Sequence, residues 1–129
     1  MPRVLIADDN DTIRRALRNI LINRDGWSVC GEAANGLQAV QMADKLDPDV
    51  VLLDFQMPVM DGLSAAREIR KVKPLLPIAM YTLHQNSHFD KQAAAVGVQK
   101  VISKDDIFSR LTASLSELVA DCPRQNGAS

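Results

Sequence analysis

Residues 50–62 read VVLLDFQMPVMDG, and this stretch carries the strongest structural signal of the chain. Its first four residues are all apolar, which is typical of a strand that is buried on both faces in a parallel sheet. Asp54 follows at once, and the residues after it include Pro58 and Gly62, which favour a loop. The stretch therefore predicts a central buried strand that ends in an aspartate at the edge of the sheet.

The rest of the chain alternates between apolar runs and helical periodicity. The apolar runs predict four more strands, at 4–7, 27–32, 78–81 and 98–103, of which 27–32 is more polar and belongs nearer an edge. Apolar residues spaced three and four apart predict helices at 13–25, 37–46, 63–73, 89–96 and 107–119. Asp11 or Thr12 is expected to cap the first helix, and Asp105 and Asp106 to lie in the first turn of the last. This alternation predicts an α/β domain whose parallel sheet is covered on both faces.

Composition narrows the class of protein. The chain has 129 residues, which suits one domain, expected over 1–120 and followed by a flexible tail or linker start at 121–129. Fifteen basic and sixteen acidic residues leave a net charge of −1, and aromatic residues make up 4%, so direct nucleic-acid binding by this chain is not expected. Cys30 and Cys122 suggest neither a disulfide framework nor a zinc site. With no apolar run long enough to span a membrane, the expected location is the cytoplasm.

Polar residues follow the predicted strands at the points where those strands end. Asp8 and Asp9 follow the first strand, Asp54 the third, Thr82 the fourth and Lys104 the fifth. Because ligands bind at the carboxyl ends of parallel strands, these residues should meet on one rim. Three adjacent carboxylates need a compensating cation such as Mg²⁺, and the lysine and threonine suit a phosphoryl group. Each residue alone could be a helix cap or a solvated side chain, but together they indicate phosphoryl transfer to an aspartate.

These residues resemble the motifs of receiver domains from bacterial two-component response regulators, over roughly residues 2–120. The similarity rests on LIADD at 5–9, LDFQMPVMDG at 53–62, YT at 81–82 and SKD at 103–105. The resemblance implies a flavodoxin-like (βα)5 fold, doubly wound, with strand order 2-1-3-4-5. It also implies a signalling protein rather than an enzyme, which assists its own Mg²⁺-dependent phosphorylation and dephosphorylation.

Carried over from the family residue by residue, Asp54 is the phosphoacceptor and also a metal ligand. Asp9 binds Mg²⁺ directly, Asp8 acts mainly through water, and the backbone carbonyl of Gln56 is a further ligand; Mn²⁺ can substitute. Thr82 and Lys104 hold the phosphoryl oxygens.

The resemblance also implies partners. The phosphodonor is a histidine kinase or a histidine phosphotransfer protein. The phosphorylated state acts on an output domain or a downstream protein, and two copies can pair through the fourth helix, fifth strand and fifth helix.

Several positions depart from the family pattern. Val101 stands where an aromatic switch residue is common, Leu83 where Ala or Gly usually leaves the acceptor open, and Ser103 where proline is frequent. Gln56 and His84 occupy the variable positions that flank the phosphoryl group. We expect Leu83 to cover Asp54 in part, and the change on phosphorylation to pass from Leu83 to Phe89 rather than through Val101, whose side chain is small and stiff.

Two other classes of protein stay open at this point. Asp9-Asn10-Asp11 loosely fits the signature of haloacid dehalogenase-like phosphotransferases, in which Asp9 would carry the phosphate. A flavodoxin-like binding module, holding flavin or acting as a scaffold that is never phosphorylated, is the second. The loop after the first strand lacks the small and hydroxylated residues that would cradle a flavin phosphate.

Overall fold

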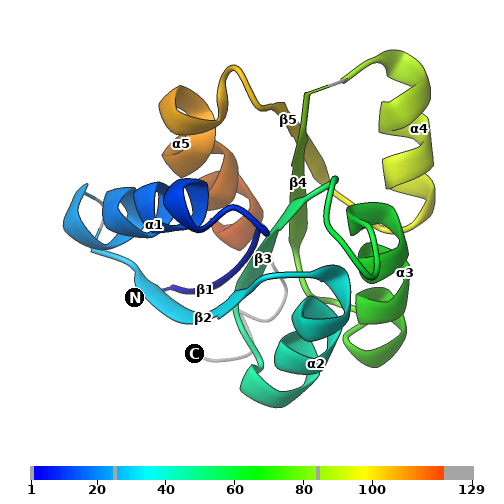
Figure 1. The fold of residues 1–129 in the computed structure, drawn as a ribbon, viewed down its shortest axis with the longest axis horizontal. Coiled ribbons are helices and arrows are strands. Elements are labelled where there is room, and N and C mark those ends of the chain that lie inside the picture. The colour runs from blue at the N-terminus through cyan, green and yellow to red at the C-terminus, as the bar shows by residue number, and fades with distance from the viewer. Residues whose placement is uncertain (1, 25, 84, 121–129) are drawn as a thin grey trace.

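The computed structural model describes residues 2–24, 26–83 and 85–120, and its strands form one parallel sheet (Figure 1). In spatial order the described strands are β2 (Ser28–Ala33), β1 (Arg3–Ala7), β3 (Val50–Asp54), β4 (Ile78–Thr82) and β5 (Lys100–Ser103). This order confirms the predicted doubly wound, flavodoxin-like fold. It also places the more polar β2 at an edge, as its sequence indicates.

Helices cover both faces of the sheet (Figure 1). The described helices are α1 (Asp11–Asn19), which continues into a π-helical turn at Ile20–Arg24, then α2 (Gly36–Leu46), α3 (Gly62–Val72), α4 (Ser87–Ala95) and α5 (Ile107–Ala120). α1 and α5 pack against one face, and α2, α3 and α4 against the other.

The central strand β3 explains why its sequence is apolar without interruption. Val50 and Leu52 belong to the core shared with α1 and α5, whereas Val51 and Leu53 belong to the core under α2, α3 and α4. All four side chains are completely buried. Each such burial contributes about 1.5–3 kcal/mol to stability. The strand is thereby fixed in place, and with it Asp54 at its carboxyl end.

Several boundaries differ from the sequence prediction. Asn10, rather than Asp11 or Thr12, caps α1, because its Oδ1 accepts the Ile13 N–H at 3.0 Å. Asp105 and Asp106 lie in the turn before α5 rather than in its first helical turn.

The fifth strand starts later than predicted, at Lys100. Just before it, the Gln99 N–H donates to the Ile78 carbonyl at 3.0 Å, and the Gln99 side-chain oxygen accepts the Ile78 N–H at 2.7 Å. Val98 is buried in the core, which explains its apolar character.

Two of the predictions concern residues that the structure does not describe: the tail at 121–129, with Cys122, and His84. Within the described ranges, no helix has both the length and the apolar character needed to cross a membrane.

Candidate functional site

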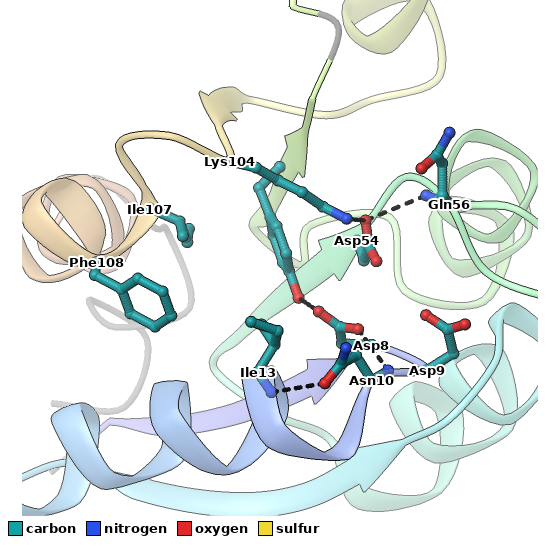
Figure 2. A pocket seen from close by; sticks show the side chains of 10 residues that line it. Asp8, Asp9, Asn10, Ile13, Asp54, Gln56, Lys104, Ile107 and Phe108 are labelled. Atoms are coloured by element: carbon teal, nitrogen blue, oxygen red, sulfur yellow. Dashed lines mark hydrogen bonds and ion pairs between the residues drawn. The ribbon is translucent and has the colours of Figure 1, made fainter.

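The carboxyl ends of β1, β3, β4 and β5 surround a cavity of about 420 Å³ (Figure 2). Its polar side is formed by Asp8, Asp9, Asn10, Asp54, Gln56 and Lys104, and its other side by Ile13, Tyr81, Ile107 and Phe108. The structure therefore brings together the acidic pair, the aspartate of β3 and the lysine after β5, which the sequence predicts to meet.

The acidic part of the cavity can hold a metal ion. Asp8, Asp9 and Asp54 each offer one carboxylate oxygen, and these three oxygens lie within 4.8 Å of one another. Asp8 and Asp54 are buried, with 1% of each residue exposed, whereas Asp9 is open to solvent. Carboxylates packed this closely repel one another, and hard oxygen ligands are those that Mg²⁺ prefers. The donor set thus fits the cation that the sequence predicts.

Asp54 is held on one side by two donors. Lys104 Nζ lies 3.0 Å from its Oδ1, and the Gln56 backbone N–H donates to the same oxygen at 3.2 Å. The pKa of Asp54 is raised from its ordinary value near 3.8 to about 6, chiefly by burial and also by the charge of Asp8, although the contact with Lys104 works in the opposite direction. In the absence of a bound metal ion, the ionised form of Asp54 therefore lowers the stability of the folded protein.

This raised pKa predicts a pH-dependent stability for the metal-free protein. The unfolded chain releases the Asp54 proton near pH 3.8 and the folded chain near pH 6, so the free energy of unfolding falls as pH rises through that window. Asp54→Asn removes this cost and is expected to stabilise the protein at pH 7 by on the order of 2 kcal/mol. The gain should shrink as pH falls from 6 to 4, as measured by urea unfolding in the presence of a chelator. A destabilised variant, or a gain that does not change with pH, would contradict this account.

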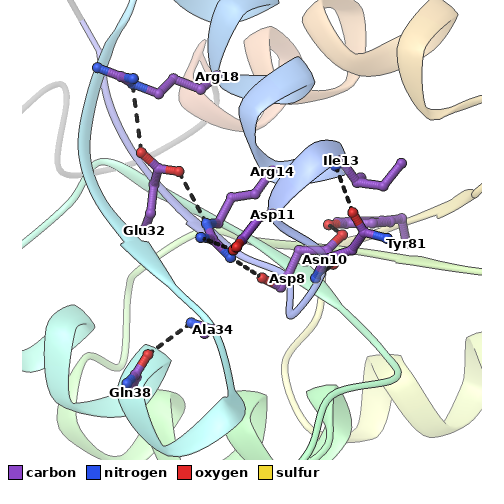
Figure 3. A network of polar contacts seen from close by, with 10 residues as sticks. All are labelled: Asp8, Asn10, Asp11, Ile13, Arg14, Arg18, Glu32, Ala34, Gln38 and Tyr81. Carbon is purple, nitrogen blue, oxygen red and sulfur yellow. Dashed lines mark hydrogen bonds and ion pairs between the residues drawn. The ribbon is translucent and has the colours of Figure 1, made fainter.

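Asp8 is fixed from both sides, by contacts that sequence analysis did not predict (Figure 3). The Tyr81 hydroxyl donates to its Oδ2 at 2.5 Å, and the Asn10 backbone N–H donates to its Oδ1 at 2.8 Å. Arg14 donates to the Asp8 carbonyl at 2.7 Å and also contacts Glu32 at 3.1 Å, which ties the loop after β1 to β2. Burial and the neighbouring carboxylates raise the pKa of Tyr81 well above its ordinary value, so this hydroxyl is a donor at neutral pH.

Of the three residues at the end of β4 and just after it, Tyr81 lines the cavity, whereas Thr82 and Leu83 do not. Thr82 is buried at the end of the strand, and its carbonyl accepts the Lys104 N–H at 2.8 Å. The β4 residue that lines the cavity is Tyr81. Leu83 has 54% of its surface exposed and is not among the residues that line the cavity, so the geometry gives no support to the expectation that it covers Asp54.

The fold and this site define a class of protein, and comparison with known proteins identifies it. The model of the response regulator receiver domain family matches residues 4–116, so the chain belongs to that family. Receiver domains are parts of two-component signalling systems, and phosphorylation and Mg²⁺ binding at an acidic pocket are typical of them. Membership argues against the haloacid dehalogenase alternative.

Curated relatives are longer proteins. The chain is 36% identical over 105 residues to the transcriptional regulatory protein YdfI of Bacillus subtilis, which covers 81% of this chain and 49% of that protein. It is also 46% identical to a protein-glutamate methylesterase/protein-glutamine glutaminase of Alkalilimnicola ehrlichii. This match extends over 80 residues and covers 62% of this chain and 20% of that protein. The chain thus spans about half or less of the length of these relatives.

Solved structures agree over almost the whole chain. The response regulator domain of Thermotoga maritima CheB has a TM-score of 0.82 at 28% identity, covering 95% of this chain and 96% of that one. The signal receiver domain of the putative response regulator NarL from Mycobacterium tuberculosis has a TM-score of 0.85 at 26% identity, covering 93% and 97%.

Proposed function

We propose that this chain is the phosphoacceptor of a two-component system and that Asp54 receives the phosphoryl group. The observation that carries the proposal is the position of the Asp54 carboxylate, 3.0 Å from Lys104 and within the cluster of three carboxylates. The lysine and a divalent cation together would neutralise the charge on an incoming phosphoryl group.

The transfer is a nucleophilic displacement at phosphorus. Lys104 and Gln56 both contact Oδ1 of Asp54, so Oδ2 is the oxygen that we expect to attack. The bond from phosphorus to the donor histidine nitrogen breaks, its electron pair stays on the imidazole, and an acyl phosphate forms on Asp54. Lys104 and the Thr82 hydroxyl then hold the phosphoryl oxygens.

Mg²⁺ would be held by Asp9, Asp54 and the Gln56 carbonyl, with Asp8 acting mainly through water; Mn²⁺ can replace it. When bound, the cation supplies positive charge beside the reacting phosphoryl group. Asp8 and Asp54 are buried in positions that suit ligands, and Asp9 stands at the open rim, where a hydrated ion enters.

The wider setting follows from the family. We infer that residues 1–120 form the receiver domain, that residues 121–129 are a tail or linker, and that the protein works in the cytoplasm as a signalling protein rather than an enzyme. Its donor would be a histidine kinase or a histidine phosphotransfer protein. Its output would be a linked domain or a separate protein, and two copies would pair through α4, β5 and α5.

The experiment that tests the proposal is labelling with acetyl phosphate in the presence of Mg²⁺. The expected product carries one phosphoryl group, which borohydride reduction and peptide mapping place on Asp54. A phosphoryl group on Asp9 would instead favour the haloacid dehalogenase chemistry, and an unlabelled protein would favour a scaffold that is never phosphorylated.

The structure also suggests how a change at Asp54 reaches the surface. Phe55, the next residue, makes an edge-to-face contact with Phe89 of α4, with ring centroids 5.0 Å apart. Phe89 and Ala93 are the buried residues of α4, so this helix is held by few apolar contacts. Val101 is partly buried against the same core. We infer that α4 is the moving element and that Phe89 couples it to the acceptor.

Phe89→Leu should therefore weaken the coupling and spare the chemistry. We expect acetyl phosphate to label this variant on Asp54, while the phosphorylation-dependent change in amide hydrogen exchange of α4 falls by at least half. Val101→Ala, a truncation in the same core, is the matched control and should keep the full exchange response. The opposite pattern would show that the signal passes through position 101.

A further inference from the structure

Tyr81 is completely buried, yet its hydroxyl reaches the candidate metal site. It lies on β4, where its register partners are Asp54 on β3 and Ile102 on β5. Its ring packs in the core formed by β1, β3, α1 and α5, and its hydroxyl donates to the Asp8 carboxylate at the wall of the cavity. The side chain therefore links a well-packed core to a carboxylate that has a proposed role in metal binding.

The two donors on Asp8 define the orientation of its carboxylate. Oδ2 accepts from the Tyr81 hydroxyl and Oδ1 from the Asn10 N–H, one from each side. The backbone of Asp8 is fixed as well, because its N–H donates to the Ala33 carbonyl at 3.0 Å and its carbonyl accepts from Arg14. A carboxylate held at both oxygens has little freedom to rotate away from its neighbours.

The chemical nature of the donor matters as much as its position. A buried carboxylate needs hydrogen bonds, but a lysine or arginine at Asp8 would also neutralise the charge that attracts a cation. A phenol hydroxyl donates without carrying a positive charge. The nearby lysine, Lys104, contacts Asp54 instead, with its Nζ 5.8 Å from the centre of the Tyr81 ring. Asp8 is thus oriented by a donor that brings no positive charge to the site.

We propose that Tyr81 is a positioning residue of the metal site, which orients the Asp8 carboxylate toward a divalent cation through its hydroxyl. This inference rests on the proposed function, since it assumes that the three carboxylates bind Mg²⁺. It goes further because it assigns a role to Tyr81, a strand residue that belongs neither to the acidic cluster nor to the pair, Thr82 and Lys104, that holds the phosphoryl oxygens.

Tyr81→Phe tests the proposal, because it keeps the ring in the core and removes only the hydroxyl. Partners that orient a metal ligand typically contribute 10–100-fold to metal affinity. We expect the binding of Mn²⁺, followed by electron paramagnetic resonance, and of competing Mg²⁺ to be about tenfold weaker in this variant, the lower end of that range, because Asp8 acts on the cation mainly through water. Ile102→Val is the matched control. It removes one methyl group from the neighbouring residue of the same core, so it should lower stability and leave Mn²⁺ affinity unchanged.

A spectroscopic readout separates positioning from packing. Tyr81 is the one tyrosine in the sequence, so protein labelled with fluorotyrosine gives a single site for fluorine NMR. Mg²⁺ should shift this resonance in the otherwise unchanged protein. Asp8→Asn should move the resonance before any metal is added, whereas Asp9→Ala should leave the metal-free resonance in place and remove the response to Mg²⁺.

The possible outcomes distinguish a failure of the role of Tyr81 from a failure of the proposed metal site. If the unchanged protein binds no Mn²⁺, both the metal site and the role of Tyr81 are wrong. If it binds Mn²⁺ and Tyr81→Phe binds it equally well or more tightly, the metal site stands and the positioning role is wrong. A fluorine resonance that saturating Mg²⁺ leaves unmoved would also overturn the role of Tyr81.

Discussion

Asp54→Asn is expected to abolish phosphoryl labelling by acetyl phosphate and by a histidine phosphodonor alike. The amide is a poor nucleophile and cannot form the acyl phosphate, although it has nearly the same shape as the carboxylate. Because Asp54 ends a strand that is buried at every position, the variant should keep its fold, and its unfolding curve in urea checks this. Incorporation of radioactive phosphate, or the mass of the intact protein, measures the loss.

Asp61→Asn is the matched control for this experiment. It removes one negative charge from the loop that follows Asp54, and Asn replaces Asp well as a helix cap, so α3 should keep the bond from the Ser64 N–H at 2.8 Å. This variant should still be labelled on Asp54. Full labelling of Asp54→Asn, accompanied by loss of labelling in Asp9→Asn, would move the phosphoacceptor to Asp9.

Much of the site follows from the sequence because parallel sheets impose a simple rule. A strand that is apolar throughout must lie in the interior, and the first polar residue after it must emerge at the carboxyl edge. That rule alone brings Asp8, Asp9, Asp54 and Lys104 to one cavity, as the structure shows. It requires no knowledge of side-chain conformation, which is why it succeeds for these four residues; Thr82, which the rule also sends to the rim, is not among the residues that line the cavity.

The contact between Tyr81 and Asp8 could not be predicted in the same way. Their positions are 73 residues apart, and the bond depends on how far a phenol reaches across the end of the sheet. In the sequence, Tyr81 is one more large residue in a buried strand. The available signal is its polar end, because a buried tyrosine hydroxyl usually finds a hydrogen-bond partner.

The loop after β3 shows a second limit of sequence analysis. Its Pro and Gly predict a turn, but Val59 adopts a positive φ of 71°, and the Met60 N–H donates to the Pro58 carbonyl at 2.7 Å across it. A β-branched residue is strained in this conformation. The packing of α2 against the loop is also specific, because a Cβ at Gly36 would lie 2.0 Å from the Met60 carbonyl oxygen. Such close approaches depend on tertiary structure.

Removal of divalent metal is expected to stop the labelling of Asp54 as completely as the loss of its carboxylate. Without the divalent metal, three carboxylates face an incoming phosphoryl dianion, and the positive charge in contact with Asp54 is that of Lys104. Excess chelator should therefore block labelling, and added Mg²⁺ or Mn²⁺ should restore it. For a metal that binds the folded chain and not the unfolded chain, Mg²⁺ at about one hundred times its Kd should raise the free energy of unfolding by about 2.7 kcal/mol.

Variants of the individual carboxylates show whether this effect belongs to the cluster. Asp9→Ala should weaken metal binding more than Asp8→Ala, because Asp9 is the proposed direct ligand and Asp8 acts through water. Asp44→Ala, on the exposed side of α2, removes the same charge from a residue that does not line the cavity, so this variant should respond to Mg²⁺ like the unchanged protein. Labelling that resists chelation, together with a melting temperature that millimolar Mg²⁺ leaves unmoved, would show that the acidic cluster does not bind metal. In that case the phosphoryl charge would have to be neutralised by the lysine alone.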